Sequence, residues 1–150
     1  MGEAEVRQSL TADPILKHNR TMEAKKLMIG DWVSDGTAHP NCVVTGIGED
    51  GHISLVRMND QWKYQKHHTG VSPIALSPEI LEGNDFWEVD NVWSWWNDEL
   101  TQSVDIYWEY DVAHVEVENG LQTHIETRIT DVHELQHLLR VADIDLDIKL

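Results

Sequence analysis

The segment from His133 to His137 reads His-Glu-Leu-Gln-His and has the residue types and spacing of a zinc hydrolase motif. Two histidines four residues apart project from one face of a helix and can bind the same metal ion, while the glutamate between them can activate a metal-bound water. A tetrahedral zinc site also needs a third protein ligand. The thirteen residues after His137 contain no histidine. The candidates for that ligand are therefore Asp143, Asp145, Asp147, His114 and His124.

The same segment has an explanation that needs no metal. Asp131 occupies the position of a helix N-cap and Glu134 follows three residues later, which resembles a capping box in which both side chains accept hydrogen bonds from backbone amides. At helical spacing, the core stripe consists of Val132, Leu135, Leu139 and Ala142. The opposite face, which we expect to be solvated, carries His133, His137 and Arg140. We therefore predict no catalytic residue and no cofactor. The alternative is a zinc hydrolase with Glu134 as base and His133 and His137 as ligands.

A second, weaker group of metal-ligand types lies in the hairpin that turns at Glu118-Asn119-Gly120. A three-residue loop that ends in a left-handed glycine keeps the apolar residues of both strands on one face, whereas a two-residue turn would mix the faces. The resulting pairs are Val117 with Leu121, Val115 with Thr123, and Ala113 with Ile125. This register places His114 opposite His124, flanked by Glu116 and Glu126. A cross-strand pair has no spacing signature for metal binding, so we interpret both histidines as surface residues and keep a metal site only as an alternative.

Tryptophans mark the expected binding surface, because seven such rings in 150 residues need a core, an interface or a ligand to cover them. Two alternating runs predict neighbouring strands that share an apolar face: Trp87, Val89, Trp93 and Trp95, then Val104, Ile106, Trp108 and Tyr110. Trp96 falls on the other face, together with acidic residues. The predicted interaction surface consists of Trp96, Glu88, Asp90, Asp105 and Glu109.

The charge pattern indicates the kind of partner. The formal net charge is −16, and the stretch between Lys66 and Arg128 holds thirteen Asp or Glu residues and neither Lys nor Arg. Such a chain disfavours direct binding of nucleic acid, which requires basic residues to displace counterions. It is typical either of a solvated face that aids solubility or of a face that contacts a basic protein, as in a nucleic-acid mimic or an inhibitor of a host factor.

Short β-branched runs separated by turns predict a β-rich α+β fold. Residues 27–33, 42–47 and 52–56, followed by a strand at 71–76, predict a small SH3-like bent sheet or barrel. An antiparallel meander follows, and the alternating residues 144–150 predict a last strand. Two short helices are expected, one that begins at Ser77-Pro78 and one from Val132 to about Ala142.

The length fits one compact domain at residues 27–150, with candidate subdomains 27–76 and 86–150, preceded by an appendage at 1–26 that has a weak helical stretch at 15–26. The single cysteine, Cys42, cannot form an intramolecular disulfide, which suits a reducing, cytoplasmic location. No apolar run is long enough to cross a bilayer and no signal-peptide core follows the N-terminus. We therefore expect no membrane association. The sequence does not indicate the oligomeric state.

Three segments, Leu27–Val33 (LMIGDWV), Pro73–Leu81 (PIALSPEIL) and Val132–Arg140 (VHELQHLLR), together resemble a family of short uncharacterised proteins from gut anaerobic bacteria and their phages and mobile elements. The resemblance covers residues 27–150 and brings no activity with it. It implies a phage or mobile-element origin. It also implies that His137 completes the zinc motif by chance, because the matching position in that family is often another residue.

Taken together, these patterns favour a non-catalytic, cytoplasmic protein that binds a basic protein partner through an acidic surface containing tryptophan. One alternative is the zinc hydrolase described above. Another is a small-molecule-binding module that uses a barrel mouth or an aromatic cleft.

Overall fold

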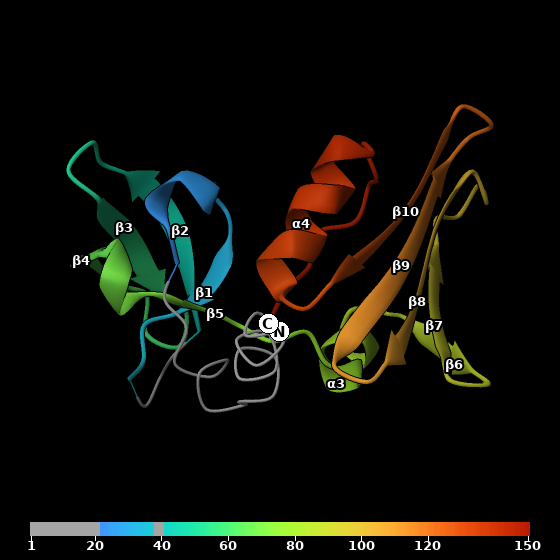
Figure 1. Cartoon of the computed structure of the whole chain (residues 1–150), viewed down its shortest axis with the longest axis horizontal. Helices are drawn as coiled ribbons and strands as arrows, with labels where there is room; N and C mark the ends of the chain where they lie inside the picture. Colours follow the sequence, from blue (N-terminus) through green and yellow to red (C-terminus); the bar gives the residue numbers. More distant parts are fainter. Residues whose placement is uncertain (1–21, 38–40) are drawn as a thin grey trace, which may run out of the picture.

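Two antiparallel sheets of five strands each lie on either side of helix α4 (Val132–Val141), as Figure 1 shows. This computed structural model describes residues 22–37 and 41–150, and the helical stretch expected at 15–26 lies mostly outside them. Within the described residues the fold is α+β and β-rich, and it has the two short α-helices that the sequence predicts. No helix in this part of the chain is long and apolar enough to span a membrane.

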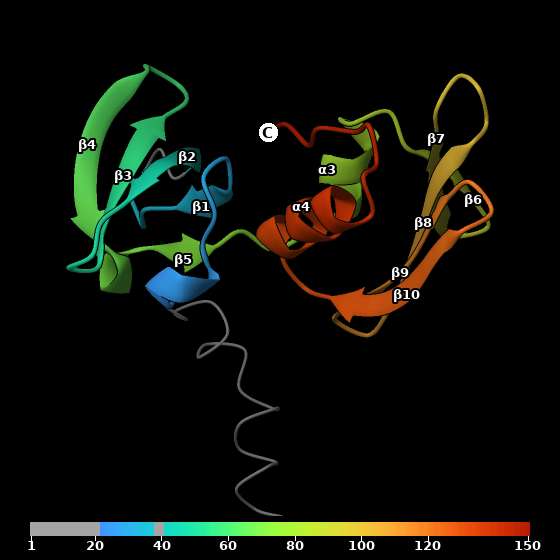
Figure 2. The ribbon, with the colours of Figure 1, turned by 90° about the horizontal axis from the view of Figure 1, so that it is seen from above.

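The first sheet has the strand order β4-β3-β2-β1-β5. Its strands are β1 (Trp32–Ser34), β2 (Asn41–Ile47), β3 (His52–Arg57), β4 (Trp62–His67) and β5 (Ser72–Pro73). Strands β1 to β4 form a meander, and β5 follows a short 3-10 helix, η2 (His68–Gly70), before it returns to pair with β1. A bulge between Val44 and Gly46 bends β2. The result is a small, bent sheet, visible on the left of Figure 2.

The core of the first sheet is built from eight apolar side chains: Met22, Leu27, Val33, Cys42, Val44, Ile53, Leu55 and Val71. Met22, which we expect in the N-terminal appendage, is instead buried, and its amide donates a hydrogen bond to the Val71 carbonyl at 3.1 Å. A short 3-10 helix, η1 (Ala24–Lys26), connects Met22 to the segment that leads into β1. The N-terminal segment is therefore anchored to the first sheet from Met22 onward.

The strand predicted at 71–76 is wrong in length, because β5 has only two residues. After β5 the chain leaves the first sheet and runs beside the start of α4. The Val132 amide donates to the Ile74 carbonyl at 2.8 Å, and the Leu76 amide donates to the Thr130 carbonyl at 3.0 Å. These backbone groups bond outside the first sheet, so the extended segment connects the two halves of the molecule instead of lengthening β5.

The second sheet is a meander with the order β10-β9-β8-β7-β6. Its strands are β6 (Trp87–Val89), β7 (Val92–Trp96), β8 (Gln102–Glu109), β9 (Val112–Asn119) and β10 (Thr123–Ile129). Figure 2 shows the sheet curving around α4 and α3 (Pro78–Glu82). We call the side toward these helices the inner face and the opposite side the outer face. The inner face contributes Val104, Ile106, Ala113, Val115, Val117 and Ile129 to a core shared with both helices.

The stretch from Trp87 to Trp95 is a hairpin and not the single strand that its alternation predicted. Strands β6 and β7 are joined at Asp90 and Asn91, whose φ angles are 54° and 67°. Two successive left-handed residues make the tight hairpin turn that favours Asp and Asn. The alternation is therefore interrupted, and residues before the turn need not share a face with their predicted partners after it.

The β9–β10 hairpin keeps the predicted faces, but the predicted pairs are wrong. The loop occupies residues 120–122, and Val117, predicted to pair with a residue in that loop, pairs with Ile125. The Asn119 side chain donates to the Ala142 carbonyl at 2.8 Å, which holds the end of β9 against the chain after α4. The offset is an even number of residues, so the apolar side chains remain on the inner face.

Burial along α4 confirms the predicted core stripe of Val132, Leu135, Leu139 and Ala142. The strand predicted at 144–150 is wrong, because this segment pairs with no strand among the described residues. Side chains take the place of a neighbouring strand: the Trp32 indole N–H donates to the Ile148 carbonyl at 2.8 Å, and the Lys149 amide donates to the Asn84 side chain at 2.8 Å. The predicted alternation still describes burial, with Ile148 almost fully enclosed.

Candidate functional site

Glu134, the candidate catalytic base, is the N3 residue of a capping box at the start of α4. Its Oε1 accepts hydrogen bonds from the Thr130 amide at 3.0 Å and the Asp131 amide at 3.1 Å. Burial raises the pKa of Glu134, but the hydrogen bonds that its carboxylate accepts outweigh burial and hold the pKa below its usual value. The capping explanation is therefore confirmed, and this carboxylate already serves the helix terminus.

His137 lies on a buried carboxylate and not on a solvated face, so that expectation is wrong. Its Nε2–H donates to the two carboxylate oxygens of Asp31 at 2.8 and 2.9 Å, and the Asp31 side chain is 0% exposed. The Arg140 guanidinium lies 3.4 Å from the same carboxylate, and the Met28 amide donates to it at 2.8 Å. This face of α4 packs against the segment before β1, and buried charges need partners of this kind.

Gln136 makes a second connection between α4 and the first sheet. Its Nε2 donates to the Gly30 carbonyl at 2.9 Å, and its Oε1 accepts from the Trp32 amide at 2.9 Å. Segments 27–33 and 132–140 are therefore in contact, and their polar residues join the two halves of the molecule. Both segments stand out in the sequence, but no periodic pattern predicts a contact between residues 106 positions apart.

His133 is buried beside the same interface, and its Nδ1 has no hydrogen-bond partner in the described part of the chain. Burial lowers the pKa of His133. Its ring lies edge-on to the His137 ring, with ring centroids 5.5 Å apart. Within residues 22–37 and 41–150, no third His, Cys, Asp or Glu brings a ligand atom into convergence with these two histidines. Two residues of the zinc motif therefore have structural roles: Glu134 caps α4, and His137 binds the buried Asp31.

Outside that interface, the outer face of the second sheet gathers acidic, histidine and aromatic side chains. Its polar and aromatic side chains, assigned from the strand register, are Trp87, Ser94, Trp96, Ser103, Asp105, Tyr107, Glu109, His114, Glu116, Glu118, His124, Glu126 and Arg128. A row of carboxylates crosses three strands, since Asp105 pairs with Glu116 and Glu116 pairs with Glu126. Like charges directly opposite each other repel across a sheet, and hydrogen bonds from Ser94 to Asp105 and between His124 and Glu116 offset part of this repulsion.

The predicted interaction surface is only partly on this face. Trp96 is 48% exposed and, with Asp105 and Glu109, belongs to the outer face. The placement of Glu88 with them is wrong, because it pairs with Trp93 across the β6–β7 hairpin and so lies on the inner side. Asp90 is wrongly placed as well, since it is in the turn.

Trp87 was predicted for the apolar face and is instead on the outer one. It pairs with Ser94 across the hairpin and is 69% exposed. Because of the turn at residues 90–91, odd-numbered side chains point outward on β6 and inward on β7. Alternation in the sequence alone does not reveal this change. The outer face therefore has exposed indole rings on both of the strands nearest the sheet edge.

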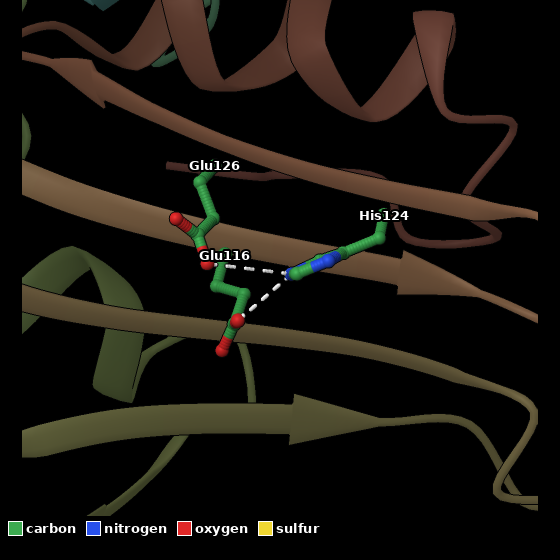
Figure 3. Close-up of side chains that lie close together, drawn as sticks. All are labelled: Glu116, His124 and Glu126. Carbon is green, nitrogen blue, oxygen red and sulfur yellow. Dashed lines mark hydrogen bonds and ion pairs between the residues drawn. The ribbon is translucent and has the colours of Figure 1, made fainter.

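Figure 3 shows three outer-face side chains that point toward one another: Glu116 from β9, and His124 and Glu126 from β10. The His124 Nε2 lies 2.8 Å from Glu116 Oε2 and 3.6 Å from Glu126 Oε1. One donor atom from each residue lies within 4.8 Å of the others. The hydrogen bond to Glu116 is the main cause that raises the pKa of His124 above its ordinary value.

His114, the other histidine of the predicted pair, is not in this cluster. It faces Arg128 across the β9–β10 hairpin, so the predicted pairing with His124 is wrong. Its ring stacks on Tyr107 with centroids 4.7 Å apart and planes at 10°. A groove of about 450 Å³ is lined by this ring pair together with Glu116, Glu126 and Arg128.

No protein-family model matches this chain, and no match was found among curated proteins or solved structures.

Proposed function

We propose that this protein is a non-catalytic, cytoplasmic binding protein, encoded by a phage or mobile element, and that its outer face receives a basic segment of another protein. The observation that carries the proposal is the row formed by Asp105, Glu116 and Glu126 across three adjacent strands. Strands β6 to β9 hold no Lys or Arg. His124 on β10 contacts Glu116 and Glu126, but β8 and β9 bring no Lys or Arg to the row. Cations supplied by a partner would therefore relieve the remaining repulsion.

Exposed aromatic rings beside the row favour a protein partner over simple counterions. Trp87 and Trp96 lie on the same face, and Tyr107 is also exposed there. Indole and phenol rings give large contact areas and attract guanidinium and ammonium groups through their π faces. A partner segment with Arg or Lys at alternate positions matches both the carboxylate row and these rings.

The test uses fluorescence anisotropy with a panel of labelled synthetic peptides that carry Arg or Lys at every second position. A triple variant, Asp105→Asn, Glu116→Gln and Glu126→Gln, removes the row. A matched control, Glu49→Gln, Glu82→Gln and Asp98→Asn, removes the same charge from exposed positions outside the outer face. We expect the row variant to bind at least about tenfold more weakly and the control to bind almost normally.

Two results would contradict the proposal. An equal loss in both triple variants would mean that net charge alone attracts the peptides. Binding that does not change between about 50 and 300 mM salt would mean that charge complementarity does not drive it.

A further inference from the structure

We propose that Glu116, His124 and Glu126 form a binding site for a divalent zinc ion on the outer face. This inference is independent of the proposed protein partner, and a negative result for zinc would leave that proposal unchanged. Its donor set is one imidazole nitrogen and two carboxylate oxygens, which zinc commonly accepts in proteins. An imidazole ligand favours zinc over calcium or magnesium, which prefer oxygen donors alone.

The distances already approach those around a tetrahedral ion. With metal–ligand bonds of about 2.0–2.2 Å, two ligand atoms on zinc lie about 3.4 Å apart. The His124 Nε2 is 2.8 Å from the Glu116 oxygen and 3.6 Å from the Glu126 oxygen. Small side-chain rotations would therefore admit the ion. His124 binds it through an unprotonated Nε2, so the proton of the hydrogen bond to Glu116 is released to solvent, or is carried on Nδ1, when zinc enters.

The paired strands hold the ligands in position. Glu116 and Glu126 are direct cross-strand partners, and His124 precedes Glu126 by two residues, so all three side chains emerge on one face. Ligands on a regular sheet lose little backbone freedom when a metal binds, which favours a preformed site. Three protein ligands leave an open position on a tetrahedral ion for water or for a group from a partner.

The surrounding charges favour a dication. Asp105 opposes Glu116 on one side, and Glu118 opposes His124 on the other. Arg128 is two residues from Glu126 and lines the adjacent groove, where its charge weakens the attraction in part. The carboxylates outnumber it, and the repulsion within the row supplies the free energy that a bound cation recovers.

Isothermal titration calorimetry of the full chain with zinc chloride, in a buffer that does not bind metal, tests the site. We expect one zinc ion per chain, and binding at least about tenfold weaker in His124→Ala and in Glu116→Gln. The matched control is His114→Ala, which removes a histidine from the same face but outside the cluster, and which should bind zinc as the unaltered protein does. Thermal denaturation without metal checks that each variant remains folded.

Several results would overturn the inference. They are the absence of a binding heat at a several-fold excess of zinc, equal binding by His124→Ala and the unaltered protein, or a loss in His114→Ala as large as in His124→Ala. Peptide binding measured in the presence of a chelator keeps this outcome separate from that of the proposed function, because the peptide test requires no metal.

Discussion

Replacing Gln136 with methionine should weaken the connection between the first sheet and α4. The amide side chain satisfies two backbone groups, the Gly30 carbonyl and the Trp32 amide, each at 2.9 Å. Methionine keeps nearly the same length and volume, so the substitution removes hydrogen bonds without leaving a large cavity. A buried backbone group left without a partner costs about 1–3 kcal/mol.

Because the Gly30 bond is only partly buried, we expect the free energy of unfolding to fall by about 2–4 kcal/mol. For a chain of this size that corresponds to a decrease in Tm of about 5–15 °C. Urea denaturation followed by tryptophan fluorescence and by far-ultraviolet circular dichroism measures the change, and agreement of the two probes checks for a single transition. The control is Gln122→Met, in the exposed β9–β10 loop, which should change stability by less than about 0.5 kcal/mol.

A change for Gln136→Met no larger than that of the control would refute the reasoning. It would mean that water or a rearranged backbone bonds the Gly30 carbonyl and the Trp32 amide at little cost. The contact between segments 27–33 and 132–140 would then not hold the sheets together.

The remaining predictions concern side chains whose roles the structure separates. Glu134→Ala should cost about 0.5–2 kcal/mol through loss of the capping box, measured by denaturation, while an unchanged stability would argue against that role. Burial lowers the pKa of His133 from its ordinary 6.5. As the pH falls below that value, the unfolded chain binds the proton more readily than the folded one, so the free energy of unfolding decreases. Urea titrations from pH 7 to 5 should show a smaller decrease in His133→Leu than in the unaltered protein. Trp32→Phe should cost about 2–4 kcal/mol, because the ring is buried and its N–H is bonded, whereas Trp96→Phe should stay within about 0.5 kcal/mol; similar losses at both sites would contradict the assigned faces.

Local patterns in the sequence were enough to predict several elements. The core stripe of α4 and its capping box follow from helical spacing and from the chemistry of Asp131 and Glu134, and both are present. The helix at residues 78–82 follows from Ser77 as N-cap and from a proline at the first position. These features depend on neighbours within one or two turns, so no distant part of the chain has to be known.

The sequence by itself determined the β-rich class, the apolar sides of the strands and the concentration of acidic residues in the second half. Only the tertiary structure decided which residues meet. Alternation with a period of two is the same for any even offset, so it could not choose the β9–β10 register that brings His124 to Glu116. Asp31 and His137 are 106 positions apart in sequence, and no periodic pattern links them. Their contact arises where α4 lies against the segment before β1, and the buried Asp31 carboxylate requires a partner there.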